Sequence, residues 1–258
     1  MKFVDAHIHL SDPEYNGKIP AIIEDAKQTG IVALVSNSMN LETSKTSLRL
    51  AQEHPSMVNA ALGIHPRNAN QLAPNELEQT INLIQQNKEK VTAIGEIGLD
   101  PQYAKRREQK NAQATVFHEM LKAAERLELP VIVHSRWSAQ KILDTLPSYT
   151  IKGVLWHWFS GPVELLPKIV ERGDYVSEGP PAAFSERIQE IVRTVPLERL
   201  LTETDGPVRY YGPFEHKPTT PAFIPEVIRA MARVKEVEER KVIEQILSNF
   251  TDLFNIAL

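Results

Sequence analysis

The sequence predicts an α/β fold with a single (β/α)8 barrel, that is, a TIM barrel, and three observations lead to this prediction. Short apolar runs alternate with amphipathic helical stretches from one end of the chain to the other. Strict alternation of this kind favours a parallel sheet with crossover helices. The length of 258 residues also suits about eight strand–helix units in one domain. We therefore treat residues 1–258 as one domain.

The expected elements follow from the apolar runs and from the residues that bound helices. Gly30 and Pro130 each come after a helical stretch, whereas Pro74 and Asn75 open one. The expected strands are 3–9, 32–37, 58–65, 92–97, 131–134, 153–157, 175–178 and 200–204. The expected helices are 19–29, 41–54, 75–86, 106–127, 138–146, 163–172, 185–194, 221–234 and 236–247. The glycines and prolines of 206–221 predict a loop over the barrel mouth.

Composition and charge exclude several classes of protein. The chain has no cysteine, so it can form neither a disulfide framework nor a thiolate metal site. The first residues lack the apolar core of a signal peptide, and the longest apolar run, 31–35, is far too short to span a membrane. We therefore expect a cytoplasmic protein. The net charge of −4 argues against a broad basic face for duplex nucleic acid, but it leaves a metal-dependent nuclease open.

The stretch Asp5-Ala6-His7-Ile8-His9 places two histidines two residues apart in an expected strand. Residues at this spacing point to the same face of a strand, so both imidazoles can reach one metal ion. The C-terminal ends of barrel strands meet at one face. Further ligand-type residues stand at the ends of later apolar runs, namely His65, Glu96, His134, His157 and Asp205. Burying so many imidazoles and carboxylates together without a metal would be costly.

The chemistry of these side chains indicates the kind of metal. Imidazole and carboxylate without sulfur suit Zn²⁺, Mn²⁺ or Co²⁺, and suit Mg²⁺ less well. The number of ligands allows two divalent ions, which would need a bridging carboxylate and a bridging water. Glu96 is the best candidate for the bridge. His7 and His9 would hold one ion. His134 and His157 would hold the other.

Asp205 would ligate the first ion, accept a proton from the bridging water, or do both. Each residue also has a structural alternative. His65 could be a core or surface histidine, Glu96 could form a salt bridge, and Asp205 could belong to a turn, since Asp-Gly-Pro favours turns.

Substrate contacts are predicted on the loops that follow the strands. Arg67 and Arg136 come shortly after His65 and His134, and guanidinium groups suit phosphate oxygens. Their alternative is a solvated side chain or an acidic partner. Aromatic residues expected on the same side could stack the bases of a single strand or pack under the loops. They are Tyr103, Trp137, Trp158 and Phe159.

The ordered motifs resemble those of the TatD family of metal-dependent deoxyribonucleases, among the amidohydrolase-like barrels. The matching segments are 5–10, 63–66, 95–100, 129–136, 157–161 and 203–207, and the most specific are Gly-Glu-Ile-Gly-Leu-Asp at 95–100 and Glu-Thr-Asp-Gly-Pro at 203–207. The resemblance implies two metal ions, with Mg²⁺ or Mn²⁺ supporting turnover and Zn²⁺ sometimes bound. It implies that His65 contacts the phosphate. The metal positions it implies are His7, His9, Glu96, His134, His157 and Asp205.

We therefore expect a divalent-metal-dependent hydrolase, and specifically a deoxyribonuclease acting as a 3′→5′ exonuclease on single-stranded DNA through a metal-bridged hydroxide. Asp205, Glu96 and His65 would be its catalytic residues, and DNA its substrate, with no membrane or obligate protein partner. One alternative is a barrel hydrolase acting on an amide, lactone or small phosphoester. Another is a non-catalytic module that keeps metal as a structural clamp. The sequence leaves DNA against RNA, exonuclease against endonuclease, the native metal and the oligomeric state open.

Overall fold

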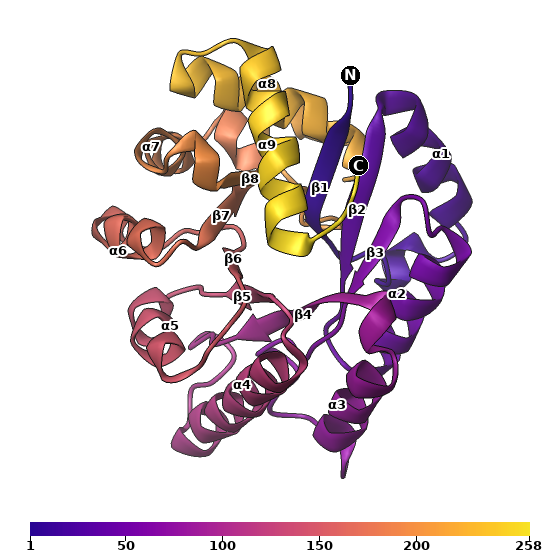
Figure 1. Ribbon diagram of the computed structural model, residues 1–258, viewed down its shortest axis with the longest axis vertical. Helices are drawn as coiled ribbons and strands as arrows, with labels where there is room; N and C mark the ends of the chain where they lie inside the picture. Colours follow the sequence, from indigo (N-terminus) through magenta and orange to yellow (C-terminus); the bar gives the residue numbers. More distant parts are fainter.

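The computed structural model describes residues 1–258 and shows eight parallel strands joined in sequence order (Figure 1). The strands are β1 (Phe3–Ile8), β2 (Ile31–Asn37), β3 (Val58–Ala61), β4 (Val91–Gly98), β5 (Val131–His134), β6 (Val154–Trp156), β7 (Tyr175–Glu178) and β8 (Leu200–Thr202). The hydroxyl of Thr202 donates to the carbonyl of Val4 at 2.8 Å, which brings β8 beside β1. The sheet thus curls into a near-closed barrel, and the predicted fold class is confirmed.

Helices surround the sheet and bury the outer faces of its strands. They are α1 (Ile19–Thr29), α2 (Leu41–Glu53), α3 (Glu76–Gln86), α4 (Arg107–Leu127), α5 (Ala139–Thr145), α6 (Leu166–Glu171), α7 (Glu186–Thr194), α8 (Ile224–Lys235) and α9 (Glu239–Phe254). Sequence signals set their ends. Gly30 ends α1 in a left-handed conformation at φ 94°, and the side chain of Asn40 caps α2 by accepting from Thr43 N at 2.9 Å.

The barrel core is apolar because the strands are covered on both faces. Every residue of β1 is buried, and Ile8, Ile94, Ile132 and Trp156 are fully enclosed. Parallel strands in this position read as nearly continuous hydrophobic runs rather than as alternating ones. Polar side chains are therefore buried where the strands end, and this is where the site lies. None of the helices is both long enough and apolar enough to cross a membrane.

The last helix covers the N-terminal end of the barrel. α9 begins at Glu239 and runs to Phe254, beyond the predicted range of 236–247. Asn249 is buried there and donates to the carbonyls of Leu197 and Leu200, at 2.8 and 2.7 Å, where β8 starts. Leu253 packs against Gly153 just before β6, where a Cβ atom would lie 2.7 Å from the leucine.

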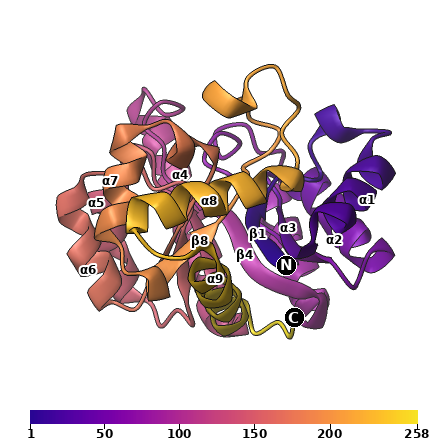
Figure 2. The same ribbon diagram turned by 90° about the horizontal axis from the view of Figure 1, so that it is seen from above.

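The segment 206–221 forms the predicted loop, and Figure 2 shows it in orange, rising beyond the strands. The hydroxyl of Tyr15 donates to the carbonyl of Thr219 at 2.6 Å, and the hydroxyl of Tyr210 donates to the carbonyl of Thr204 at 2.8 Å. These two bonds tie the loop to the turn that follows β1 and to the chain just after β8. Its first residues line the cavity described next.

Candidate metal centre

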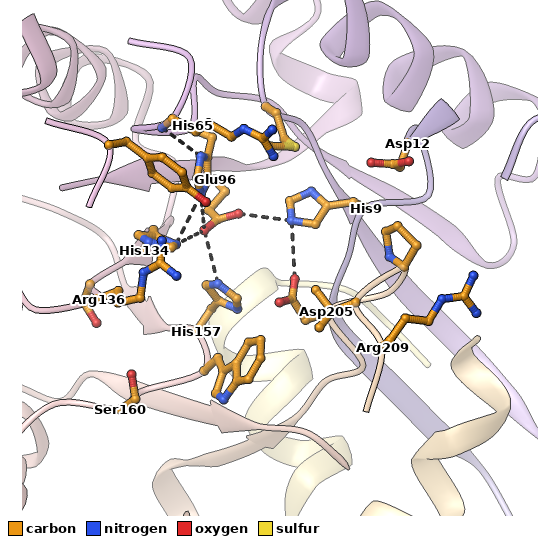
Figure 3. Close-up of a pocket in the computed structure, with 17 residues that line it drawn as sticks. His9, Asp12, His65, Glu96, His134, Arg136, His157, Ser160, Asp205 and Arg209 are labelled. Carbon is orange, nitrogen blue, oxygen red and sulfur yellow. Dashed lines mark hydrogen bonds and ion pairs between the residues drawn. The ribbon is translucent and has the colours of Figure 1, made fainter. Parts of the chain in front are cut away.

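A cavity of ≈ 610 Å³ lies at the C-terminal ends of the strands (Figure 3). His7 is fully buried directly beneath it and contacts the residues of its floor. The other residues predicted to form the site all line this cavity, namely His9, His65, Arg67, Glu96, His134, Arg136, His157 and Asp205. The structure therefore brings together every predicted site residue, from strands or strand ends that are far apart in the sequence.

The first group of potential ligands surrounds one oxygen of Glu96. Nε2 of His7 and Nε2 of His9 lie 3.3 Å apart. Glu96 Oε2 lies 3.5 Å from the first of these nitrogens and 3.2 Å from the second. Asp205 Oδ1 lies 3.5 and 3.4 Å from the same two nitrogens. Both carboxylates thus lie within 3.5 Å of the same two imidazole nitrogens.

The second group surrounds the other oxygen of Glu96. His134 Nδ1 lies 2.7 Å from Glu96 Oε1, and His157 Nε2 lies 3.2 Å from it. His65 Nε2 lies 3.5 Å from the same oxygen. Glu96 therefore presents one oxygen to each group of imidazoles, which is the placement needed for a bridging carboxylate.

Three of these histidines turn their outer ring nitrogen toward a hydrogen-bond acceptor. The bonds join His9 Nδ1 to the carbonyl of Asn37 at 3.1 Å, His134 Nε2 to Asp100 Oδ2 at 2.8 Å, and His157 Nδ1 to Glu203 Oε1 at 3.2 Å. A nitrogen that donates such a bond carries the proton, so the inner nitrogen of a neutral ring presents its lone pair to the cluster. Histidines that bind metals have this arrangement.

His65 is turned the other way. The backbone N–H of Arg67 donates to His65 Nδ1 at 2.9 Å, so the proton of the neutral ring lies on Nε2. Burial lowers the pKa of His65 to about 3, although the charge of Glu96 opposes the change. The ring is therefore neutral and points an N–H donor into the cavity. Such a donor suits a substrate oxygen better than a metal ion.

The spacing of the first group fits a bound metal ion. Ligands about 2.0–2.2 Å from a tetrahedral ion lie about 3.3–3.6 Å from one another. The Nε2 atoms of His7 and His9 lie 3.3 Å apart, and each lies 3.2–3.5 Å from Glu96 Oε2 and from Asp205 Oδ1. Glu96 Oε2 and His7 Nδ1 are also buried without a hydrogen-bond donor or acceptor. A cation would compensate the unpaired carboxylate oxygen, whose burial is otherwise costly.

The electrostatics of the cluster favour ionised carboxylates. Burial and the charge of His157 lower the pKa of His7 to about 3. Burial opposes the charged form of His9, but the nearby carboxylates of Asp205 and Glu96 outweigh it and raise its pKa to about 10. Burial likewise opposes ionisation of both carboxylates, yet the surrounding histidines hold the pKa of Glu96 well below its usual value and lower that of Asp205. The site is thus built for positive charge.

Sequence reasoning missed the residues that orient the histidines. Asp100 and Glu203 are buried acceptors for His134 and His157. Asp5 accepts from the backbone N–H groups of His7 at 3.2 Å and Thr204 at 3.0 Å, and so joins the two ends of the barrel sheet. A signal for Glu203 was present, because it stands two residues before Asp205 and so shares its face. Asp100 ends the most specific motif of the chain.

The predicted arginines lie at the rim of the cavity. Arg136 donates from Nε to Asp100 Oδ2 at 2.9 Å, and its Cζ lies 5.2 Å from the ring centre of Tyr103. Arg67 also lies near that ring, with its Cζ 5.8 Å from the centre. Arg209, which sequence reasoning did not single out, lines the opposite side of the cavity near Asp205 (Figure 3).

A (β/α)8 barrel that gathers imidazoles and carboxylates at the C-terminal ends of its strands defines a class of metal-binding barrel proteins. Residues 4–255 match the family described as TatD related DNase. The chain therefore belongs to the TatD family, and the resemblance inferred from its motifs is confirmed.

Relatives match the chain over nearly its whole length. An uncharacterized metal-dependent hydrolase of Methanocaldococcus jannaschii is 32% identical over 254 residues, which cover 98% of this chain and 97% of the relative. The human deoxyribonuclease TATDN3 is 30% identical and covers 97% of this chain, which in turn covers 94% of it. The crystal structure of the TatD homologue YjjV from Escherichia coli has a TM-score of 0.90 and 28% identity, over 99% of this chain and 98% of that one.

Proposed function

We propose that this protein is a divalent-metal-dependent hydrolase that cleaves the phosphodiester bonds of DNA, removing nucleotides from the 3′ end of a single strand. The orientation of the histidines is the observation that carries this proposal. His9, His134 and His157 direct their inner nitrogens at Glu96 because their outer nitrogens are bonded elsewhere. Two ions held by this cluster, whether Mg²⁺, Mn²⁺ or Zn²⁺, would explain why each oxygen of Glu96 faces imidazole nitrogens.

The chain's own residues would divide the chemistry as follows. A pair of divalent ions, when bound, lowers the pKa of water enough to supply hydroxide near neutral pH. Asp205 faces the cavity as an ionised carboxylate, and would accept the proton that the attacking water loses. Glu96 would hold the ligands of both groups in place. His65 would donate its Nε2–H to a phosphate oxygen.

The arginines support an anionic substrate. The chain as a whole carries a net charge of −4, yet Arg67, Arg136 and Arg209 all line the cavity. Guanidinium groups match the geometry of phosphate oxygens, and Asp100 fixes Arg136 in the right place for such a contact. The name of the human relative, a deoxyribonuclease, points to the same substrate class.

The first experiment measures hydrolysis of labelled single-stranded DNA, RNA, a chromogenic phosphodiester, and a set of lactones and amides. Each reaction is run with Mg²⁺, Mn²⁺ or Zn²⁺ and with a chelator. We expect cleavage of DNA from its 3′ end, loss of activity with the chelator, and recovery with Mg²⁺ or Mn²⁺. Turnover of a lactone or amide alone would replace the proposal with the other barrel hydrolases. No turnover of any compound would favour a non-catalytic role for the metal.

Substitutions test the roles of the residues. Glu96→Ala and Asp205→Asn should each abolish hydrolysis while circular dichroism shows a folded barrel, because each removes an essential carboxylate from the cluster. Glu164→Gln changes an exposed carboxylate outside the cavity and should leave activity unchanged. Wild-type turnover in the Glu96 or Asp205 variant would refute the assigned roles.

Arg136→Ala should raise KM for DNA much more than KM for the small phosphodiester.

A further inference from the structure

We propose that the exposed ring of Trp137 is an outer subsite that stacks an unpaired base of the strand being cleaved. This inference rests on the proposed function and adds a residue that selects the substrate. The structure separates Trp137 from the other aromatic residues near the mouth, fixes its position, and places it beside the arginine that would contact phosphate.

The aromatic residues near the mouth differ in exposure. Phe159 is fully buried, with its ring 6.1 Å from that of Trp156, so of the two alternatives predicted for it, packing holds and base stacking does not. Trp158 is half-buried and lies 5.7 Å from the ring of Tyr210. Trp137, in contrast, is 72% exposed. Its ring is therefore accessible to a ligand, and its contact with Arg136, described next, distinguishes it from a scattered surface aromatic.

The ring of Trp137 extends a stack that begins inside the cavity. The Cζ atom of Arg136 lies 5.2 Å from the ring centre of Tyr103 and 5.4 Å from that of Trp137. Both distances are within the range of a cation–π contact. Asp100 holds the guanidinium in place by accepting from Nε at 2.9 Å and by pairing with Nη2 at 2.7 Å. The guanidinium therefore covers one face of the indole and leaves the other open.

The backbone also fixes the point from which the indole projects. Trp137 has φ 54°, in the left-handed region that bulky residues rarely adopt. Ser138 closes this turn by donating from its N–H to the carbonyl of Ser135 at 2.9 Å. Its hydroxyl donates to the carbonyl of Leu99 at 2.6 Å, which ties the turn to the end of β4. The ring is consequently presented by an anchored turn at the start of α5.

Trp137 directly follows residues that line the cavity. His134 and Arg136 line the cavity, and Trp137 is the next residue outward. A phosphate held by Arg136 would bring an adjoining base to the open face of the indole. Inside a duplex, both faces of a base are already stacked, so this subsite selects an unpaired base.

The test compares Trp137→Ala and Trp137→Phe on a single-stranded oligonucleotide and on the same strand with abasic residues at its 3′ end. Losing one stacked base should raise KM for the normal strand about 5- to 150-fold in the alanine variant. Neither KM for the abasic strand nor kcat should change. The phenylalanine variant should recover most of the affinity, because it restores an aromatic face.

Binding is measured independently of turnover by tryptophan fluorescence in the presence of a chelator. The normal strand should quench the exposed indole of wild type, and the quench should be lost in Trp137→Phe and with the abasic strand. Tyr211→Ala removes a ring of similar exposure, 73%, that has no cation–π contact with Arg136, and should behave as wild type. Equal effects of Trp137→Ala on both strands would overturn the stacking role alone. Failure to cleave any phosphodiester would instead overturn the proposed function.

Discussion

At the scale of single residues, the role of each histidine depends on the atom that its outer nitrogen meets. His134 meets the carboxylate of Asp100, whereas His65 meets the backbone N–H of Arg67. One contact holds the ring so that its inner nitrogen can offer a lone pair to a cation, and the other leaves a proton facing the cavity. Two histidines that look alike in the sequence are therefore suited to different tasks, metal binding and substrate contact.

Glu178 is a buried carboxyl group outside the cluster. Neither of its oxygens has a hydrogen-bond donor. Burial raises its pKa well above the usual 4.5, the charge of Glu203 adds to the rise, and the charge of His157 opposes it. The folded protein therefore keeps the proton of Glu178 at pH values where the unfolded chain has released it. The free energy of unfolding therefore falls as the pH rises from the ordinary pKa of a glutamate toward the raised pKa of Glu178.

We predict that Glu178→Gln removes this loss of stability, because glutamine has nearly the same shape and does not titrate. The Tm of the variant relative to wild type should increase from about pH 5 to about pH 8, as measured by thermal unfolding in matched buffers. Glu164→Gln, at an exposed carboxyl, should track wild type over the same range. A constant difference between Glu178→Gln and wild type would show that Glu178 does not titrate differently on folding.

The residue scale also marks the limit of sequence reasoning. The gathering of the candidate ligands was predictable because each follows an apolar run and barrel strands end together. The orientation of each ring was not, since the acceptor for His9 is the carbonyl of Asn37, which a different strand brings near. The exposure of Trp137 depends on the turn that Ser138 anchors to Leu99, and the local sequence does not indicate this contact.

At the scale of elements, strand paths were predicted better than strand ends. The range 58–65 was expected as one strand, but the regular pairing of β3 stops at Ala61. A register shift occurs between Ala60 and Ala61 where β3 meets β4. Leu62 still donates to the carbonyl of Ala93 at 3.1 Å, so the chain continues in the expected direction toward His65. Hydrophobic patterns give the direction of a strand, whereas its last paired residue depends on the neighbouring strand.

The α9 helix yields a prediction about stability alone. The side-chain amide of Asn249 satisfies two carbonyls at the start of β8, whereas the carboxylate of an aspartate in its place could only face them as a further acceptor. Asn249→Asp should therefore lower the free energy of unfolding by about 1–3 kcal/mol, measured by urea denaturation. Lys241→Gln, an exposed change on the same helix, should have little effect.

The hydrolytic activity of Asn249→Asp should stay at the wild-type level at temperatures where the variant is folded, because α9 covers the end of the barrel opposite the cavity. A large loss of kcat in the folded variant would mean that the two ends of the barrel are linked.

At the scale of the whole molecule, the (β/α)8 barrel was predictable because each strand–helix unit is local in sequence. The position of the candidate site was predictable from the barrel, since the C-terminal ends of its parallel strands lie at one face. The loop 206–221 was predictable only as an irregular segment. The bond from Tyr15 to Thr219 that anchors it spans most of the chain, and no local pattern indicates it.

The cluster also predicts that metal binding stabilises the fold. A ligand that binds only the folded state at about 100 times its Kd adds about 2.7 kcal/mol to stability. Added Mn²⁺ or Zn²⁺ should therefore raise the Tm of metal-free protein, as followed by differential scanning fluorimetry. Glu96→Ala should lose most of this rise, because both groups of ligands share Glu96. The same rise in that variant would place the bound ion elsewhere.

One oxygen atom contacts both a candidate metal ligand and the arginine proposed to bind substrate. Asp100 Oδ2 accepts from His134 at 2.8 Å and from Arg136 at 2.9 Å. A cation on His134 makes its Nε2–H a stronger donor and draws on the same lone pairs that hold the guanidinium. A cation bound at His134 would then alter the affinity of Arg136 for an anion. By thermodynamic linkage, the anion would change the affinity for the cation by the same factor. The carboxylate of Asp100 would thereby couple the binding of a cation at the inner cluster to the binding of an anion at Arg136.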